Sequence, residues 1–527
     1  MNTLIKSQKT KHLIYYAVFG VIAITLMTYY FSNTLIHYTS DRQFPIDSFK
    51  ELPLTILIFP AELFSFLFGM YFVYNLTTDT LRSKKQITLI GKENIPVALL
   101  IPVYHEPKNI VDRTLLACSK VNWKGKTQIY LLDDSTNTES KEQMSKLGKK
   151  YGAIVVRRAD RVGYKAGNLN NAIKNVVKEP YFVIFDSDQA PEPSFLEETM
   201  DQFTDPNVGF VQTPQHYIED KNLLQRAAKI GVNIFYHTQC VSKSNDNAIP
   251  FCGTNVVVKT EIFKKVGGFS YYTSTEDIDL GIRINSEGFR GVYVPHILSH
   301  GFAPPDYKAY SSQQYRWANG NLAILREYGL KILKGNFPIR YQIHTFFTLG
   351  WWLIGLVTLL YITVPLLSLF FGLGTHHTWL PSWLLVLLFF NVALGISMVY
   401  VSLNSRVDNE KVKFSDALIQ YSLITNSSFL YAKAAFNALI LKRYIGFVTT
   451  DKKGSSVGLR PIMWNLILSG ICFVSSIYAL YKGFLGGDIQ QIRTFIPLSL
   501  WLLFYSAILM SSILFIGENP ETKKESV

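Results

Sequence analysis

YFVIFDSDQ, residues 181–189, decides the fold of this chain. Its five apolar residues predict a short buried strand, and two aspartates follow directly where that strand would end. Similar apolar runs precede it at 97–103, 128–132 and 153–156. Helical patterns follow these runs near 108–120, 139–151 and 168–178. Such alternation predicts a parallel sheet covered by helices, with ligands bound beyond the carboxyl ends of the strands.

Polar clusters stand at those strand ends: Tyr104-His105-Glu106, Asp133-Asp134-Ser135 and Asp186-Ser187-Asp188. One acidic pair after a strand is usually a turn or a helix cap, but three clusters at equivalent ends make coincidence a poor explanation. Asp186 and Asp188 have the spacing to hold one hard divalent cation, Mg²⁺ or Mn²⁺, which prefers oxygen ligands. Lys165 precedes a predicted helix and could neutralise a diphosphate, with an ordinary surface lysine as the alternative.

Six apolar runs approach the roughly 20 helical residues that cross a membrane. They cover 13–31, 53–76, 346–373, 383–403, 462–481 and 495–516. Charged residues are only 17% of the chain, which is low for a soluble protein. The first run has a signal peptide as its alternative interpretation, but no small-residue cleavage site follows it. Glu62 is an ionisable group inside the second run.

Lysines and arginines near the span ends predict that both termini and the domain between spans two and three are cytoplasmic, in a plasma-membrane protein. Residues 415–440 are interpreted as an interfacial helix, with a seventh span as the alternative. The net charge of +13 is accompanied by no nucleic-acid-binding motif. We therefore expect the bilayer as a partner and no nucleic acid.

Three further motifs follow: Phe251-Cys252-Gly253-Thr254-Asn255, Thr275-Glu276-Asp277 and Gln313-Gln314-Tyr315-Arg316-Trp317. With the acidic clusters, their order and spacing over residues 101–317 resemble the processive glycosyltransferases of family 2, closest to the cellulose synthase branch. Residues 447–452 resemble the gating loop of that branch, in which Phe447, Thr450 and Lys452 keep their positions.

The resemblance implies a role for each matched residue. Asp277 would be the general base, with Glu276 and Asp133 in the catalytic set. Donor contacts would come from Glu106, Asp133, Lys165, Asp186, Gln313 and Arg316, and acceptor contacts from Trp317, Cys252 and Gly253. Asp186 and Asp188 would hold the Mg²⁺ or Mn²⁺ ion. The pattern departs from the family at Val103 and His105, where threonine and asparagine are usual, and at Gln189, where histidine is usual. The missing hydroxyl at position 103 places donor affinity in question.

The expected fold is therefore a multi-pass α-helical membrane protein with an inserted cytosolic α/β domain of the GT-A, Rossmann-like kind. Its parts would be helices 1–2 in 1–80, the transferase domain in 81–342, and helices 3–6 in 343–527 with a gating loop at about 444–455. The implied activity is processive, inverting synthesis of a β-glucan from a UDP-sugar, UDP-glucose first, with the growing polysaccharide as acceptor and translocated product. Alternatives are single addition to a polyprenyl phosphate or lipid, a hyaluronan- or chitin-type synthase, or a scaffold with an inactive domain. A homo-oligomer is left open.

Overall fold

The computed structural model describes residues 46–81, 94–218, 221–372, 413–443, 458–485 and 489–516, with single positions at 25, 28 and 32. The chain forms two compact units. One holds residues 82–350 and 434–455, and the other holds 1–81, 351–433 and 456–527. Phe447, Thr450 and Lys452 of the expected gating loop lie outside the described residues, as do almost all of the first expected span and all of the fourth.

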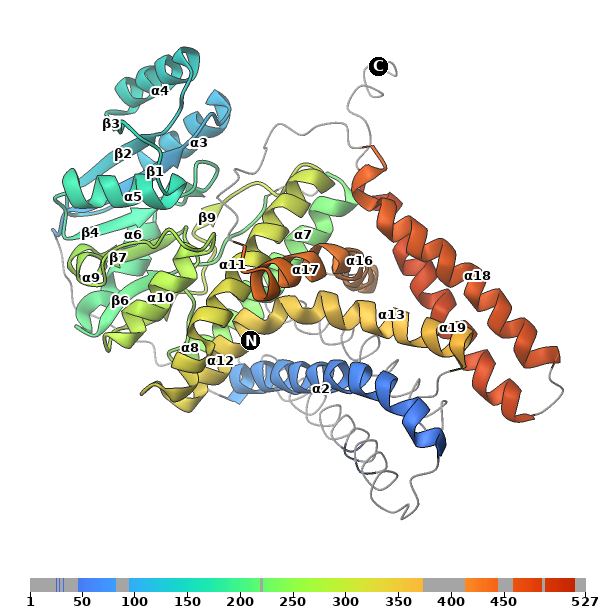
Figure 1. Ribbon diagram of the computed structural model, residues 1–527. Helices are drawn as coiled ribbons and strands as arrows, with labels where there is room; N and C mark the ends of the chain where they lie inside the picture. Colours follow the sequence, from blue (N-terminus) through green and yellow to red (C-terminus); the bar gives the residue numbers. More distant parts are fainter. Residues whose placement is uncertain are drawn as a thin grey trace, which may run out of the picture. The chain divides into compact units, whose positions relative to one another are not determined.

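The first unit is built on a sheet whose described strands follow the order β3-β2-β1-β4-β7-β6-β8 (Figure 1). They are β1 (Val97–Val103), β2 (Thr127–Asp133), β3 (Ile154–Val156), β4 (Tyr181–Ile184), β6 (Val208–Gln212), β7 (Val256–Lys259) and β8 (Arg290–Tyr293). Every residue of β1 is buried, as expected for a strand covered on both faces. Val103 pairs with Asp133, so the first two acidic clusters begin at the same edge.

Strand β7 corrects the expectation of a purely parallel sheet, because it runs antiparallel to both β4 and β6. The chain enters β7 from the edge where the parallel strands end. Segment 250–255 therefore lies beside Asp186, whose backbone N–H donates to Thr254 Oγ1 at 2.9 Å. The Asn255 N–H donates to the Ile184 carbonyl at 2.8 Å. The reversal delivers the motif with Cys252 and Gly253 to the same edge as the aspartates.

Helices cover both faces of this sheet. On one face, α3 (Lys108–Cys118), α4 (Thr138–Tyr151) and α6 (Phe195–Thr199) share a core with Leu99 and Val183. On the other, α5 (Tyr164–Asn175), α9 (Thr260–Lys265) and α10 (Glu276–Ser286) share a core with Leu100 and Phe182. Alternate strand residues thus feed opposite faces.

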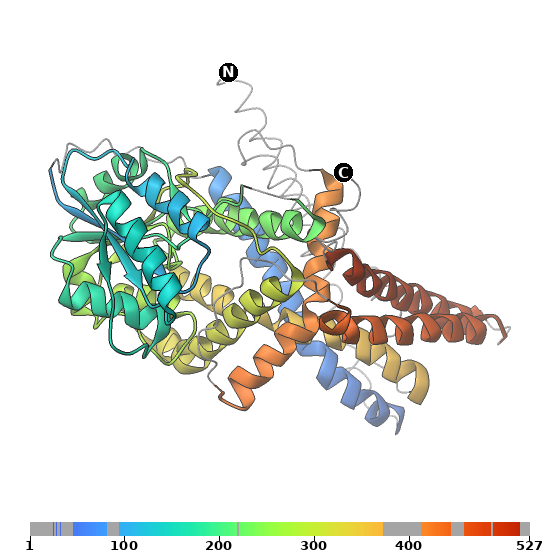
Figure 2. The ribbon, with the colours of Figure 1, turned by 90° about the horizontal axis from the view of Figure 1, so that it is seen from above.

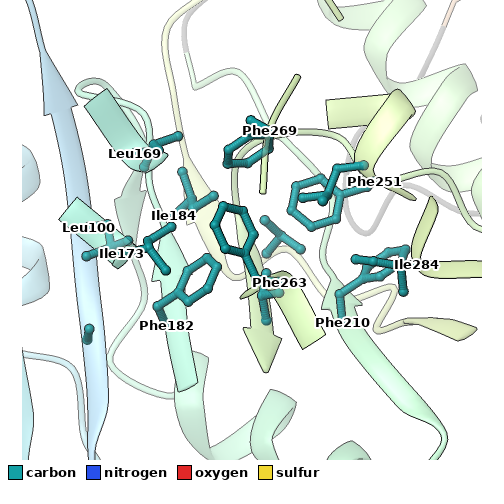
Figure 3. Packing of buried hydrophobic residues seen from close by; sticks show 14 of the residues in the cluster. Leu100, Leu169, Ile173, Phe182, Ile184, Phe210, Phe251, Phe263, Phe269 and Ile284 are labelled. Atoms are coloured by element: carbon teal, nitrogen blue, oxygen red, sulfur yellow. The ribbon is translucent and has the colours of Figure 1, made fainter. Parts of the chain in front are cut away.

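The second of these cores is rich in aromatic side chains (Figure 3). The Phe182 and Phe263 rings meet edge to face with centroids 5.3 Å apart, and Phe269 contacts Phe263 at 5.2 Å. Edge-to-face packing of large rings is favourable beyond the area it buries. This core anchors the segments that lead into the site at the strand ends.

Longer helices complete the unit. Helix α7 (Leu223–Ile234) continues through a π-helical turn, Phe235–Cys240, into α8 (Val241–Asn245). Helix α11 (Tyr307–Lys334) is capped by Asp306, whose side chain accepts the Ala309 N–H at 2.8 Å. A two-stranded ribbon pairs β5 (Ala190–Pro191) with β9 (Ser299–His300). The first segment of the unit, residues 82–350, ends with α12 (Ile339–Gly350).

Four described helices are long and apolar enough to cross a membrane: Ile56–Asn75, Ile339–Phe371, Arg460–Leu485 and Thr494–Phe515. They belong to α2 (Ile46–Leu81), α12 with α13 (Ile354–Phe371), α18 (Met463–Leu485) and α19 (Ile489–Met510). Helices α18 and α19 run side by side (Figures 1 and 2). Segment 415–440 forms α16 (Phe414–Asn426), α17 (Ser428–Ala435) and a π-helical turn, Phe436–Ile440.

Polar side chains in the second unit bond between its helices. Trp501 Nε1 donates to the Tyr361 carbonyl at 2.8 Å, and the Tyr361 hydroxyl lies 2.7 Å from Ser65 Oγ. Asn465 Nδ2 donates to the Asn426 carbonyl at 2.9 Å. Polar groups that face lipid without a partner are costly, so such pairs favour helix association in a bilayer.

Candidate active site

Asp133 and Asp134 at the end of β2 are held by two arginines that follow β3. Arg157 Nε donates to Asp133 Oδ2 at 2.8 Å, and Arg158 donates to both oxygens of Asp134 at 2.9 and 2.6 Å. The Ser135 N–H donates to Asp133 Oδ1 at 3.0 Å. Both carboxylates are therefore buried with fixed orientation. The sequence analysis missed these arginines, although a basic pair after one strand and an acidic pair after its neighbour were a usable signal.

The end of β1 carries Glu106, whose carboxylate accepts the Tyr104 backbone N–H. His105 between them has a φ of 59°, a left-handed value that asparagine, aspartate and histidine adopt more readily than other side chains. Its ring contacts Thr136 Oγ1 at 2.9 Å and Ser140 Oγ at 3.2 Å. His105 therefore holds the loop after β2 against the end of β1.

Lys165 connects three of the predicted site segments. It stands in the first turn of α5, after Gly163 and Tyr164, which both have positive φ. Its ammonium donates to Asp186 Oδ1 at 2.5 Å and to the Gly253 carbonyl at 3.1 Å. A lysine between a carboxylate and an open strand edge is well placed to meet an anionic ligand.

The turn that carries Asp186 and Asp188 is fixed from α3. Thr114 Oγ1 donates to the Ser187 carbonyl at 2.8 Å, and Arg113 donates to the Asp188 carbonyl at 3.2 Å. Burial raises the pKa of the Tyr217 hydroxyl, and the negative charges of Asp188 and then Asp186 raise it further, so both carboxylates lie near that ring. Tyr217 also hydrogen-bonds Gln313.

The two aspartates suit a divalent cation that takes its other ligands from substrate. Among the described residues, no three His, Cys, Asp or Glu side chains form a cluster that could hold a metal alone. The Asp186 side chain is 36% exposed, so its oxygens are accessible. Mg²⁺ characteristically binds through one or two carboxylates plus substrate phosphates and water.

Asp277 starts helix α10 directly beside Gly253. A β-carbon at Gly253, which has a φ of 72°, would lie 2.8 Å from Asp277 Oδ2, so glycine permits this approach. Asp277 Oδ1 accepts the Ile278 N–H at 2.9 Å. Burial raises the pKa of Asp277, whereas the Ile278 hydrogen bond and the charges of Lys165 and Arg316 lower it.

Glu276 and Arg316 both lie close enough to Asp277 to interact with its charge. Burial, and then the Asp277 charge, raise the pKa of Glu276 to about 7. Burial lowers the pKa of Arg316, while Glu276, Asp186 and Asp277 oppose that change. The structure thus brings together Lys165, Asp186, Gly253, Glu276, Asp277 and Arg316, as the motifs predicted.

Of the expected acceptor residues, Cys252 lies next to Gly253. Its backbone N–H donates to Gln212 Oε1 at 2.9 Å, and burial raises the pKa of its thiol well above the ordinary value. A thiol that stays protonated is a packing group and not a nucleophile. Trp317, partly buried, follows Arg316 on α11, and its carbonyl accepts from Asn321 Nδ2 at 2.9 Å.

The chain is similar in sequence to known glycosyltransferases. Residues 181–398 match the model of "Glycosyl transferase family group 2". The chain is 27% identical over 454 residues to a cellulose synthase catalytic subunit (UDP-forming) of Pseudomonas fluorescens, which covers 81% of this chain and 57% of that protein. It is 32% identical over 237 residues to that of Xanthomonas axonopodis pv. citri, covering 44% of this chain and 32% of that protein. The matches thus span about a third to somewhat over half of these relatives.

One solved structure shares the fold: a mannosyltransferase from Pyrobaculum calidifontis in complex with GDP-Man and Mn²⁺, at a TM-score of 0.53 and 17% identity. The match covers 76% of this chain and all of that one. The mixed sheet, the motifs at its edge and the sequence similarity all indicate a glycosyltransferase. Residues 181–398 therefore match the family group 2 glycosyl transferases, the chain is similar to cellulose synthase catalytic subunits, and candidate membrane helices stand on both sides of its mixed sheet in the sequence.

Proposed function

We propose that this protein is a processive, inverting glycosyltransferase that polymerises a β-glucan from UDP-glucose and passes it across the plasma membrane. The observation that carries the proposal is that Asp277 lies against Gly253, close enough to Lys165 and Arg316 for their positive charges to lower its pKa. One half-buried carboxylate and two cations at a single strand edge suit attack by a hydroxyl on a sugar diphosphate.

In this reaction Asp277 accepts the proton of the attacking acceptor hydroxyl as that oxygen bonds to the anomeric carbon. The bond from that carbon to the diphosphate breaks, and its electron pair leaves with UDP. Lys165 and Arg316 counter the charge that develops on the leaving group. A single base with attack opposite the leaving group inverts an α-linked donor to a β-linked product.

Residues at the ends of β1 and β2 would hold the nucleoside. Asp133 is fixed by Arg157 and Glu106 by the Tyr104 N–H, so both carboxylates are oriented before a ligand arrives. Asp186 and Asp188 would hold Mg²⁺ or Mn²⁺, which when bound supplies further positive charge to the diphosphate. Gln313 would support the Asp186–Asp188 end of the site through its hydrogen bond with Tyr217.

Acceptor and product would occupy the other side of the site. The Trp317 indole suits the apolar face of a terminal sugar ring, and Cys252 and Gly253 would line the same subsite. Phe447, Thr450 and Lys452 would close over the loaded donor. We place the catalytic domain and both termini on the cytoplasmic side, so that polymer leaves through the membrane helices.

The decisive experiment supplies the purified protein with UDP-glucose, UDP-N-acetylglucosamine, UDP-glucuronate and GDP-mannose in parallel. We expect UDP-glucose to give a long product by gel filtration that a β-glucanase of one linkage specificity digests. Transfer of one sugar to lipid, or polymer from another donor, would contradict the proposal.

Asp277→Asn is the matched loss-of-function variant. It should abolish polymer while UDP binding, measured calorimetrically, stays within about threefold, since the base acts on the acceptor and not on the nucleotide. Asp112→Asn is the control, because Asp112 pairs with Lys150 on the surface of the same unit. Polymer from Asp277→Asn would exclude it as the base.

A further inference from the structure

We propose that segment 266–275, which we call the strap, positions the cations Lys165 and Arg316 relative to the base Asp277. Its positioning residues are Asn170, Asp279 and Arg283. The strap connects α9 to α10. It contacts the three helices that carry Lys165, Asp277 and Arg316. The inference deepens the proposed function and rests on it, because it assigns these residues a part in the same transfer.

The first attachment is to α5, which carries Lys165. Asn170 on that helix is 4% exposed, and its amide bonds both backbone groups of Phe269. Nδ2 donates to the Phe269 carbonyl at 2.8 Å, and Oδ1 accepts the Phe269 N–H at 2.8 Å. A β-carbon on Gly268 would lie 2.5 Å from Asn170 Oδ1, so glycine is needed for this contact.

The strap also touches the start of α5 directly. The Tyr271 ring lies so close to Gly163 that a β-carbon there would be 2.5 Å from Tyr271 Cε1. Asn170 Nδ2 additionally donates to the Tyr271 hydroxyl at 3.1 Å. Gly163 has a φ of 74° and stands two residues before Lys165. The backbone that aims Lys165 is therefore packed against the strap.

The second attachment is to α10, which carries Asp277. Asp279 is fully buried and accepts from the Tyr272 hydroxyl at 2.5 Å and from Arg283 Nη2 at 2.7 Å. Arg283 in turn donates to the Val266 and Gly268 carbonyls at 2.5 and 2.7 Å. Removing one member of such a buried ionic network leaves the other charge uncompensated.

The third attachment is to α11, which carries Arg316. Ser274 Oγ donates to the Arg316 carbonyl at 2.9 Å, and Thr273 Oγ1 donates to the Gly320 carbonyl at 3.2 Å. These bonds reach the backbone of the site arginine itself. Within ten residues the strap thus holds the backbone near each of the three charged groups.

Transfer requires these charged groups to be aligned at the same moment, whereas UDP binding does not. The Lys165–Asp186 and Arg157–Asp133 ion pairs join side chains that both lie outside the strap. The alignment of α5, α10 and α11 stabilises the transition state, in which the bond from the anomeric carbon to the diphosphate breaks. Loss of that alignment should therefore lower kcat and leave the affinity for UDP nearly unchanged.

The test compares Asp279→Asn with Asp205→Asn. Both remove one carboxylate from an arginine pair in the same unit, since Asp205 accepts from Arg290 at 2.8 Å away from the site. We expect Asp279→Asn to lower kcat for UDP release at least about 10-fold with UDP affinity within about threefold. Asp205→Asn should keep wild-type kcat. Tyr272→Phe, which removes one hydroxyl, should lower kcat about threefold and serves if Asp279→Asn does not fold.

Wild-type kcat in both Asp279→Asn and Tyr272→Phe would contradict the positioning role of the strap. Equal losses of kcat and UDP affinity would contradict it as well. UDP release counts transfer to any acceptor, so polymer length is measured separately. Absence of polymer from the wild type, with UDP release intact, would contradict the polymerase proposal alone.

Discussion

At the scale of single residues, the site is governed by two carboxylates that follow one another in sequence, the buried Glu276 and the half-buried Asp277. Glu276 and Asp277 stand in the first turn of α10, where the helix N-terminus favours negative charge. Burial acts in the opposite direction and raises the pKa of both groups. Lys165 and Arg316 partly offset that increase, so the cations that would meet the leaving group also keep the base ionised.

This balance predicts the pH dependence of the reaction. A base must be ionised to accept a proton, so kcat should fall as pH falls through the raised pKa of Asp277. We expect an acidic limb above the ordinary aspartate value of 3.8. Glu276→Gln should leave this limb in place, because the pKa of Glu276 is about 7 and its carboxyl is already neutral when Asp277 takes up a proton. A limb at or below the ordinary aspartate value of 3.8, or a shift of the limb in Glu276→Gln, would contradict this.

Metal binding is also decided at single residues. We expect Mn²⁺, followed by electron paramagnetic resonance, to bind more tightly when UDP is present, because phosphate oxygens complete its ligands. Asp188→Asn should weaken that binding at least about 10-fold, and EDTA should stop turnover until Mg²⁺ or Mn²⁺ is added. The control is again Asp112→Asn. Binding unaffected by Asp188→Asn would remove this residue from the metal site.

At the scale of elements, the site depends on how closely α11 approaches the residues before α10. Gly320 has no side chain, and a β-carbon there would lie 2.6 Å from Thr275 Oγ1 and 2.8 Å from Ser274 Oγ. Glycine inside a helix costs roughly 1 kcal/mol relative to alanine. Close packing next to Arg316 and Asp277 is a sufficient reason to keep it.

Gly320→Ala should therefore push α11 away and lower kcat by about 100-fold, the order expected for a displacement near 1 Å. Gly329→Ala on the same helix is the matched control, since its β-carbon would meet Leu325 Cδ1 at an ordinary 3.4 Å. That control should keep activity and raise the thermal midpoint slightly. Equal kcat in the two variants would show that the close approach is unimportant.

At the scale of the whole molecule, the stretch from Val97 to Gly335 contains no candidate span among its described residues and no long apolar run in its sequence. Candidate spans stand on both sides of it in the sequence. The bonds from Trp501 to Tyr361 and from Asn465 to Asn426 give the helical unit internal polar contacts of its own. A polymer made at the strand edge and released through such helices would be carried across the bilayer.

Reconstitution into vesicles tests that transfer. With UDP-glucose outside and the catalytic domain facing it, we expect polymer to accumulate inside, where added glucanase cannot reach it until detergent is present. Vesicles with Asp277→Asn provide the blank. Polymer that is digested before detergent is added would contradict export while leaving synthesis intact.

The sequence by itself determined four strands of the sheet and which charged side chains stand at their ends. Strand β1 was predicted to the residue, and β2, β3 and β4 to within one residue at each end, because fully apolar runs between helices leave little alternative. Asp186, Asp188, Glu276 and Asp277 follow from short local motifs. The gating-loop role of Phe447, Thr450 and Lys452 remains a prediction.

Tertiary structure alone decided what depends on contacts between distant segments. The reversal of β7, the arginines that hold Asp133 and Asp134, and the strap around Asn170 and Asp279 leave no periodic pattern in the sequence. Apolar periodicity reports which face of a local element is buried. It does not report which buried polar group will meet which, because hydrogen-bond partners are chosen by the packing of the folded chain.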